Sequence, residues 1–364
     1  MHLARLWLTD FRCYRHAELE LAAGVTVISG ANAQGKTSLL EAVAWTATGA
    51  SFRGVPDAAL VRAGCDTAVV RADIVDDERG QRFEAEIHSV GRNRVRVNGQ
   101  ALRRVQDRAD VVRVTVFAPD DLQLVKSGPA GRRAYLDDLL VATAPRFAAV
   151  RVEYDRILRQ RNALLKQGVR SRDDERTLDV FDDQLAAAGA ELVSGRLRLL
   201  EGLAPLVAVA YGELAGPAVD VTAAYESSWL PDVRADPAPA LLHALRDRRR
   251  AEQERRVTLA GPHRDEWRLG IGALDSRTHA SQGEQRTLAL ALRVAGHRLC
   301  TDVIGTPPVL LLDDVFSELD EHRAAALLAH LGGGQTLVTT AGAIPVGLHP
   351  EQVVRVDAGR LEAA

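Results

Sequence analysis

The chain is poor in cysteine and has no long apolar segment, and each shortage excludes a class of protein. Its 364 residues include three cysteines, Cys13, Cys65 and Cys300, which are far apart and not in CxxC spacing. This pattern predicts neither a disulfide framework nor a zinc site. No stretch approaches the ~18 consecutive apolar residues of a membrane span, and no charged leader with an apolar run opens the sequence. We therefore expect a cytoplasmic protein without a membrane-spanning segment.

Lysine is scarce as well, and the balance of charge is slightly acidic. Three of the 46 basic residues are lysines, and the formal net charge is −3. Such a charge argues against a protein that coats nucleic acid by bulk electrostatics. In so arginine-rich a chain, the presence of Lys36 indicates a site that the fork of an arginine does not fit.

Lys36 belongs to the segment GANAQGKTS, which matches the phosphate-binding pattern GxxxxGK[ST]. The apolar run Val25–Ser29 before it predicts a strand, and a helical pattern follows it. Glycines let the backbone wrap around phosphates, and the start of the following helix attracts the same anions. Thr37 would supply a hydroxyl ligand to Mg2+. The segment predicts a loop that binds ATP through Gly30, Ala31, Asn32, Ala33, Gln34, Gly35, Lys36, Thr37 and Ser38.

A second apolar run, Val309–Leu312, predicts a buried parallel strand that ends at two carboxylates. Open α/β sheets bind their ligands at the carboxyl ends of such strands. We expect Asp313 to bind Mg2+ together with Thr37. We expect Asp314 to be the catalytic residue, which orients the water that attacks ATP.

The hexapeptide SQGEQR, from Ser281 to Arg286, precedes a strong helical pattern. A serine and the N–H groups of a helix start can form an anion site. Taken alone, the hexapeptide is more typical of an ordinary helix start. It resembles, however, the signature motif of ABC ATPases, in which this site covers the γ-phosphate bound by another subunit. The resemblance implies that Ser281 and Gly283 bind the ATP of a second copy, so that two chains close face to face over two ATP molecules.

The motifs lie toward the two ends of the chain, and a helical region separates them. Up to residue 117, short strand-like runs alternate with turns; helical patterns then cover Arg132–Lys166, Leu178–Leu214 and Ala240–Arg256. We predict an α/β fold, an ABC/SMC-type ATPase head of the P-loop NTPase class with a β-rich first lobe and an inserted helical arm. The predicted domains are residues 1–130 and 257–364 for the two parts of the head, and 131–256 for the arm.

The whole chain resembles the RecF family of recombination mediators, which have an SMC-like ATPase head. The resemblance rests on LTDFRCY from Leu8, FAPDDLQLVKSGPAGRRAYLD from Phe117, GPHRDE from Gly261 and LLLDDVFSELD from Leu310. It implies an ATP-binding and DNA-binding protein of DNA repair, replication restart, recombination and the SOS response. It also implies a weak ATPase that acts as a switch, a homodimer closed by ATP on gaps and junctions of single- and double-stranded DNA, and cooperation with RecO and RecR in loading RecA.

Two positions depart from the ABC pattern. Asp314 stands where a glutamate is usual, which puts the rate of hydrolysis in question. A further predicted strand, Gln335–Val338, leads to Thr339 and Thr340, where transporters often have a histidine. Threonine can donate a hydrogen bond but carries no charge, so Thr340 is a weaker candidate for the site. The residue of the glutamine loop stays open among Asp120, Asp121 and Gln123.

The sequence leaves the roles of Arg12 and of the segment GPHRDE open. Arg12, in the turn after the first predicted strand, resembles the arginine that approaches the nucleotide in SMC-like heads. His263, Arg264 and Asp265 form a tight polar set within GPHRDE. A structural ion pair and a catalytic role are equally open for this set.

Basic residues gather in particular segments although the whole chain is acidic. Arg146–Arg172 contains eight basic and two acidic residues, and Arg92–Arg113 contains seven and two. Arg246–Arg256 forms a third cluster. Each could neutralise several phosphates, although a solvated protein face is an equal alternative. The candidates for binding DNA are Arg92, Arg94, Arg96, Arg103, Arg104, Arg151 and Arg159.

Three other functions compete with this interpretation. An ABC transporter ATPase would share the motifs, but the aspartate at 314, the missing histidine and the long insert argue against it. An SMC-like structural tether would need a longer coiled-coil arm, and recognition of DNA structure would separate it from a mediator. An SMC-like nuclease partner would need a His/Asp metal cluster, and we find none with nuclease spacing.

Overall fold

The computed structural model describes residues 1–76, 79–102, 108, 111–216, 220–329 and 333–363. The chain forms two compact units: a first unit of Met1–Leu122, Ala210–Ala218 and Thr287–Ala364, and a second unit of Gln123–Val209 and Val219–Arg286. Within the described residues, no helix is long and apolar enough to cross a membrane. The predicted domain division at residues 130 and 256 stays a prediction, although packing places residues 257–286 in the same unit as most of the arm helices.

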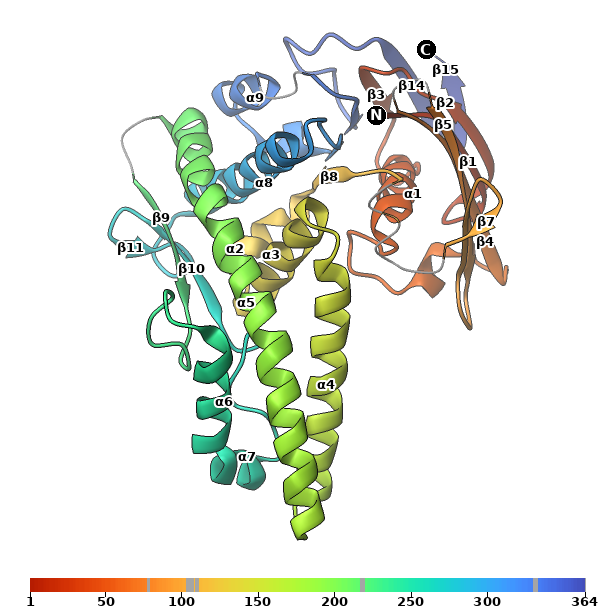
Figure 1. Cartoon of the computed structure of the whole chain (residues 1–364). Helices are drawn as coiled ribbons and strands as arrows, with labels where there is room; N and C mark the ends of the chain where they lie inside the picture. Colours follow the sequence, from red (N-terminus) through yellow and green to blue (C-terminus); the bar gives the residue numbers. More distant parts are fainter. Residues whose placement is uncertain (77–78, 103–107, 109–110, 217–219, 330–332, 364) are drawn as a thin grey trace. The chain divides into compact units, whose positions relative to one another are not determined.

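One sheet of the first unit is antiparallel, with the strand order β2-β1-β4-β5-β6-β7 (Figure 1). Side chains alternate between its faces, so that Leu6 and Leu8 of β1 are buried and Trp7 between them is partly exposed. The strands are β1 (His2–Phe11), β2 (Tyr14–Glu20), β4 (Thr67–Asp76), β5 (Arg79–His88), β6 (Arg94–Val97) and β7 (Gln100–Ala101).

The other sheet of the first unit has the order β15-β14-β3-β13-β12-β8, and all its strands except β15 run parallel. β12 and β13 are buried along their whole length, as expected for parallel strands covered on both faces. Because β3, β13 and β12 are parallel neighbours, their carboxyl ends lie side by side at one edge. The strands are β3 (Val25–Ser29), β8 (Val114–Phe117), β12 (Val309–Asp313), β13 (Thr336–Thr340), β14 (Gln352–Asp357) and β15 (Arg360–Ala363).

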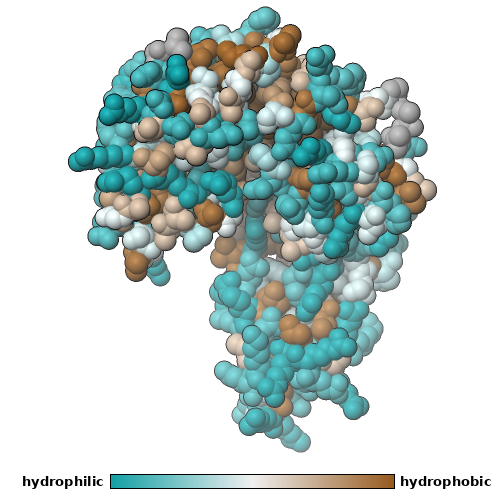
Figure 2. Space-filling view, turned by 180° about the vertical axis from the view of Figure 1, so that it is seen from behind, coloured by the Kyte–Doolittle hydropathy of each residue, from teal (hydrophilic) through white to brown (hydrophobic). Residues whose placement is uncertain are grey.

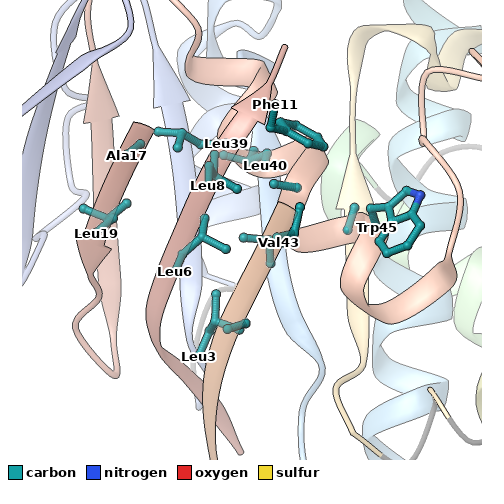
Figure 3. Close-up of a cluster of buried hydrophobic side chains, with 14 of the residues drawn as sticks. Leu3, Leu6, Leu8, Phe11, Ala17, Leu19, Leu39, Leu40, Val43 and Trp45 are labelled. Atoms are coloured by element: carbon teal, nitrogen blue, oxygen red, sulfur yellow. The ribbon is translucent and has the colours of Figure 1, made fainter. Parts of the chain in front are cut away.

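Helix α1 (Lys36–Thr48) packs into the core of the first unit and ends at Gly49, whose φ of 71° suits glycine. Figure 3 shows Leu39, Leu40 and Val43 of this helix among side chains of β1 and β2. The buried contacts fix the beginning of α1, which directly follows the predicted phosphate loop. The first unit also contains α9 (Glu321–Leu328) and the part of α8 (Gln282–Ile304) that follows Arg286.

The second unit is mainly helical and has a small antiparallel sheet of order β11-β10-β9. The predicted helical stretch 132–166 is two helices, which are separated around Pro145, a residue that favours such a break. The predicted helix 240–256 is likewise two helices. Leu122 of α2 and the last turn of α5, from Ala210, belong to the first unit. The elements are α2 (Leu122–Lys126), α3 (Pro129–Thr143), α4 (Phe147–Gln167), α5 (Arg172–Ala215), α6 (Pro237–Asp247), α7 (Arg249–Arg255), β9 (Val221–Glu226), β10 (Glu266–Ile271) and β11 (Leu274–Asp275).

Candidate nucleotide-binding site

The segment from Gly30 to Thr37 joins β3 to α1 as a tight loop. A Cβ atom at Gly30 would lie 2.3 Å from the carbonyl oxygen of Val356, and φ at Gly30 is 152°. At Gly35, φ is 116° and a Cβ atom would lie 2.7 Å from the sulfur of Cys13. Only glycine fits these two positions, so backbone alone lines the loop there. Such a loop at a helix start suits phosphate.

The side chain of Lys36 folds back over this loop and is almost fully buried. Its Nζ donates hydrogen bonds to the carbonyl oxygens of Gly30, at 2.7 Å, and Ala31, at 2.8 Å. Burial lowers the pKa of Lys36, and the negative charges of Asp314 and Asp313 oppose that shift. The ammonium group therefore lies inside the loop, close to both carboxylates of the acidic strand.

The turn between β14 and β15 holds the loop from another side. Gln34 Oε1 accepts a hydrogen bond from the Ala358 N–H at 2.6 Å, and the Gln34 carbonyl accepts one from the Gly359 N–H at 3.2 Å. Ala358 and Gly359 both have positive φ, 45° and 75°, as in the primed turns of hairpins. The partners of Gln34 are thus more than 300 residues away in the sequence, and no local pattern predicted this contact.

Thr37 and Asp313 meet at the carboxyl edge of the sheet. The Thr37 hydroxyl donates to Asp313 Oδ1 at 2.9 Å, and the Thr339 hydroxyl donates to the same oxygen at 2.8 Å. The Asp314 N–H in turn donates to the Thr339 hydroxyl at 2.9 Å. Burial raises the pKa of Asp313, and the two hydroxyl donors lower it. The three elements that carry these residues are therefore tied together by hydrogen bonds.

The structure corrects the prediction for the strand at Gln335–Val338. Strand β13 extends through Thr340, so Thr339 and Thr340 do not follow the strand as predicted. Thr339, which the sequence did not single out, contacts Asp313, whereas the weaker candidate Thr340 accepts a hydrogen bond from the Gly342 N–H at 3.2 Å. The sequence could not distinguish the two threonines because the choice depends on the register of β13 against β12.

The pair of Thr37 and Asp313 fits a magnesium site of the kind completed by a nucleotide. One hydroxyl and one carboxylate are few ligands, but Mg2+ commonly retains waters and takes its remaining ligands from phosphates. Among the described residues, no group of three or more His, Cys, Asp or Glu side chains could hold a metal ion. The residues present therefore suit Mg2+ bound together with phosphates.

Asp314 and Arg53 are two further charged residues of this edge. Asp314 has φ 51° and ψ 27° and precedes the short helix η4 (Val315–Glu318). Its charge raises the pKa of Asp313, whereas the charge of Arg53 lowers it. Arg53 is exposed in the loop after α1, and no motif in the sequence indicated it. The edge thus has a cation that the sequence analysis missed.

Arg12 lies in the turn between β1 and β2 and pairs with a buried carboxylate. Its guanidinium donates to the two oxygens of Glu41 at 2.7 and 2.6 Å, and to the carbonyl of Ala59 at 2.8 Å. Glu41 is fully buried in α1 and also accepts from the Ser51 hydroxyl. These contacts engage the guanidinium, and the predicted approach of Arg12 to a nucleotide stays a prediction.

Replacing Arg12 with alanine is expected to lower the free energy of unfolding by about 3 kcal/mol, because Glu41 would stay buried without its cation. Urea-induced unfolding followed by circular dichroism measures this change. Arg15→Ala in β2 is the matched control, since Arg15 is exposed, and a change within about 0.5 kcal/mol is expected for it. Unchanged stability of the Arg12 variant, together with lost ATP affinity, would contradict a structural role.

Ser281 and Gly283 are exposed at the start of α8, in the second unit. Ser281 Oγ accepts a hydrogen bond from the Glu284 N–H at 3.3 Å, and Glu284 Oε2 accepts one from the Ser281 N–H at 2.7 Å. This reciprocal pair is a capping box, and its hydrogen bonds lower the pKa of Glu284. The hexapeptide is therefore an ordered helix start, which is compatible with the predicted signature role.

The candidates for the glutamine loop have different environments. Asp121 Oδ1 accepts from Arg293 Nε at 2.9 Å, so this carboxylate has a partner within the first unit. Asp120 and Gln123 are exposed. The choice among the three residues stays open.

The candidate DNA-binding arginines lie in both units. Arg92, Arg94 and Arg96 are exposed on or next to β6 of the first unit, and Arg94 is 3.6 Å from Glu86. In the second unit, Arg151 pairs with Asp138 at 2.6 Å, and Arg159 is exposed on α4. Figure 2 shows mainly hydrophilic side chains over the part of the second unit where α4 ends and α5 begins. The remaining candidates, Arg103 and Arg104, lie outside the described residues.

The motif GPHRDE lies in a polar network of the second unit. Asp265 is buried and accepts hydrogen bonds from the Tyr225 hydroxyl at 2.7 Å and from Trp229 Nε1 at 2.8 Å. His263 Nδ1 lies 2.6 Å from the Tyr154 hydroxyl, and burial lowers the pKa of His263 to about 4. Arg264 donates to the carbonyl of Thr258 at 3.0 Å. These contacts give the motif a structural role in joining helices to β10.

Comparison with known proteins agrees with this geometry. The family model described as RecF/RecN/SMC N terminal domain matches residues 2–343. The chain is 42% identical over 368 residues to the DNA replication and repair protein RecF of Acidothermus cellulolyticus, with 97% of this chain and 99% of that protein covered. It is 45% identical over 354 residues to the protein of the same name from Frankia alni, with 94% and 93% covered.

Solved structures give the same relationship. The recombination mediator protein RecF with ATP, of the RecFOR pathway, has a TM-score of 0.92 at 29% identity, with 100% of this chain and 97% of that chain covered. The SMC head bound to the C-winged helix domain of ScpA has a TM-score of 0.59 at 15% identity, with 100% and 97% covered, and is alike in fold alone. The predicted ABC/SMC-type head fold is confirmed. The chain belongs to the RecF family of DNA replication and repair proteins.

Proposed function

We propose that this chain is an ATP-controlled recombination mediator, which closes as a dimer on gapped or junction DNA and helps to load RecA. One observation carries the proposal: Lys36, Thr37 and Asp313 converge at one sheet edge in a chain that matches RecF proteins over nearly its whole length. The solved RecF with ATP supports ATP as the ligand. A cytoplasmic location and cooperation with RecO and RecR follow from the same resemblance.

The residues of the loop have distinct tasks in this proposal. Lys36 exchanges its carbonyl partners Gly30 and Ala31 for the β- and γ-phosphate oxygens of ATP. Thr37 and Asp313 hold Mg2+, which neutralises phosphate charge when it is bound. Arg53 adds a positive charge to the same edge.

The signature segment supplies the link between ATP and assembly. Ser281 and Gly283 of one copy cover the γ-phosphate held by the loop of the other copy, so the site is complete only in the dimer. ATP can drive dimerisation only to the extent that it binds the dimer more tightly than the monomers. Hydrolysis, in which Asp314 orients the attacking water, removes that difference and opens the dimer.

Replacing Asp314 with asparagine is expected to slow ATP hydrolysis about 100-fold and to prolong the ATP-bound dimer, because the amide cannot accept the proton of the water. Asparagine tolerates the left-handed backbone at this position, where φ is 51°, so the fold should persist. Phosphate release and dimer lifetime measure the effect. Asp302→Asn, at an exposed position of α8, is the control. Hydrolysis at the wild-type rate in the Asp314 variant would remove this residue from the mechanism.

Replacing Arg92 and Arg96 together with glutamate is expected to weaken DNA binding, because both exposed cations would contact phosphates. The slope of log K against log salt concentration should fall in magnitude by about 2. Fluorescence anisotropy at several salt concentrations measures both quantities. Arg176→Glu combined with Arg234→Glu, at two exposed positions of the second unit, is the control with the same change in net charge. Unchanged affinity and slope would exclude this surface.

Sedimentation velocity of the wild-type protein tests the assembly step. A monomer without nucleotide and a dimer with Mg-ATP are expected. A protein that stays monomeric at saturating ATP, or that is equally dimeric without it, would contradict ATP-controlled closure.

A further inference from the structure

A tight turn begins at the end of β11 and leads directly into the signature segment, Ser281–Arg286. Asp275 Oδ1 accepts hydrogen bonds from the N–H of Arg277 at 3.0 Å and of Thr278 at 3.2 Å. The His279 N–H donates to the Asp275 carbonyl at 3.1 Å. Ser276 is buried, and its hydroxyl donates to the carbonyl of Leu269 in β10 at 2.8 Å. The turn is thereby fastened to the small sheet of the second unit.

Gln285 connects this turn to helix α8. Its side chain is 6% exposed, and Nε2 donates to the carbonyl of Ser276 at 3.1 Å and to that of Arg277 at 3.2 Å. Its own N–H donates to the carbonyl of Ser281 at 3.0 Å. Gln285, itself the fifth residue of the signature hexapeptide, is therefore bonded both to the turn before Ser281 and to Ser281.

Exposure changes along this helix start. Ser281 and Gly283 are exposed, whereas Gln285, four residues after Ser281, is buried. A buried amide with both hydrogens bonded to carbonyls has one preferred orientation, because an unpaired N–H in the interior is costly. The Gln285 side chain thus ties the helix start, which carries the exposed residues, to the turn that precedes it.

We propose that Gln285 is a positioning residue for the signature, which fixes the orientation of Ser281 and Gly283 so that they fit the phosphate held by a second copy. The proposal rests on the dimeric function proposed above and goes beyond it, since Gln285 itself touches no nucleotide. Without its two donated hydrogen bonds, the helix start at Ser281 loses its connection to this turn and can take several orientations. Ordering it again on closure then weakens the dimer.

In this proposal, replacing Gln285 affects dimer assembly and leaves ATP binding by the monomer unchanged. The phosphate loop lies in the first unit and Gln285 in the second, and a monomer binds ATP through its own loop. The ATP affinity of the monomer should therefore be unchanged when Gln285 is replaced. The affinity between ATP-bound copies should fall, by about tenfold for two neutral hydrogen bonds.

The test uses Gln285→Met, which keeps the volume and removes the donor, and Gln285→Glu, which places a carboxylate against the two carbonyls. Sedimentation with Mg-ATP gives the dimer dissociation constant, and a fluorescent ATP analogue at low protein concentration gives the monomer affinity. Weaker dimers at unchanged monomer affinity are expected, with the larger effect in Gln285→Glu.

Gln335→Met is the matched control, because Gln335 is also buried and its Nε2 also donates to two carbonyls, those of Leu3 at 2.7 Å and Ala22 at 2.8 Å. This control should lose stability in urea without weakening the dimer. Wild-type dimerisation in both Gln285 variants, or equal weakening in Gln335→Met, would overturn the positioning role. A wild-type protein that never dimerises with ATP would instead refute the proposed function, and this inference with it.

Discussion

Lys36→Met is expected to lower the affinity for ATP about 100-fold or more. The ammonium group donates to two carbonyls within the loop, and the same donors would meet phosphate oxygens. Hydrogen bonds that involve charged groups are stronger than neutral ones, so the loss of several of them is large. Methionine has a similar length and no charge, and it fills the buried space. Isothermal titration with ATP and magnesium measures the loss.

The other lysines provide the control for this experiment. Lys126 in α2 and Lys166 in α4 are exposed, and both lie in the second unit. Lys126→Met and Lys166→Met remove the same charge and should leave the ATP affinity unchanged. An ATP affinity of Lys36→Met within a few-fold of the wild type would contradict the assignment of the loop.

Ser281→Arg is expected to separate ATP binding from assembly. The variant should bind ATP as a monomer with wild-type affinity, because the phosphate loop is intact and lies in the other unit. Its dimerisation with ATP should weaken about 100-fold or more, since the larger side chain would occupy the place of the partner's phosphate. Light scattering coupled to gel filtration distinguishes the two states.

Replacing Ser281 also removes the cap of α8 and so destabilises the helix start, and a second capping serine serves as the control for this loss. Ser171 has the same arrangement at the start of α5: its hydroxyl accepts from the Asp174 N–H at 3.1 Å, and Asp174 Oδ2 accepts from the Ser171 N–H at 2.9 Å. Ser171→Arg should remove an equivalent cap, lower the free energy of unfolding by about 1 kcal/mol, and dimerise normally. Equal dimerisation of Ser281→Arg and the wild type would refute the shared site.

The local parts of the site could be predicted from the sequence because they depend on neighbouring residues. Strand β3 has the predicted bounds, and α1 follows the loop as expected. The buried run before Asp313 is a strand of the parallel sheet. In each case the apolar run, the glycines and the helix start are adjacent in the chain, so short-range patterns were sufficient.

The contacts that complete the site depend on sheet order and register, which no short segment encodes. Thr339 reaches Asp313 because β13 lies between β3 and β12, in a register that pairs these two residues. Gln34 meets Ala358 because β14 is the other neighbour of β3. A sequence pattern names the residue types for such contacts but not their partners.

Charge counts along the sequence were misleading for a similar reason. Arg161, within the basic segment 146–172, is fully buried and pairs with Asp182 at 2.8 Å and Glu252 at 2.7 Å, carboxylates that are 21 and 91 positions away. A window of the sequence records the arginine and not these partners. Arg161 therefore holds the helices of the second unit together and contributes nothing to an exposed basic surface.

Binding to gapped DNA, measured by fluorescence anisotropy with and without Mg-ATP, tests the central claim most directly. An ATP-controlled mediator should bind the gapped duplex more tightly with Mg-ATP than without it, and more tightly than an intact duplex or a single strand. Equal affinity with and without ATP, or no binding to any DNA, would contradict the claim that ATP controls the protein's engagement with DNA.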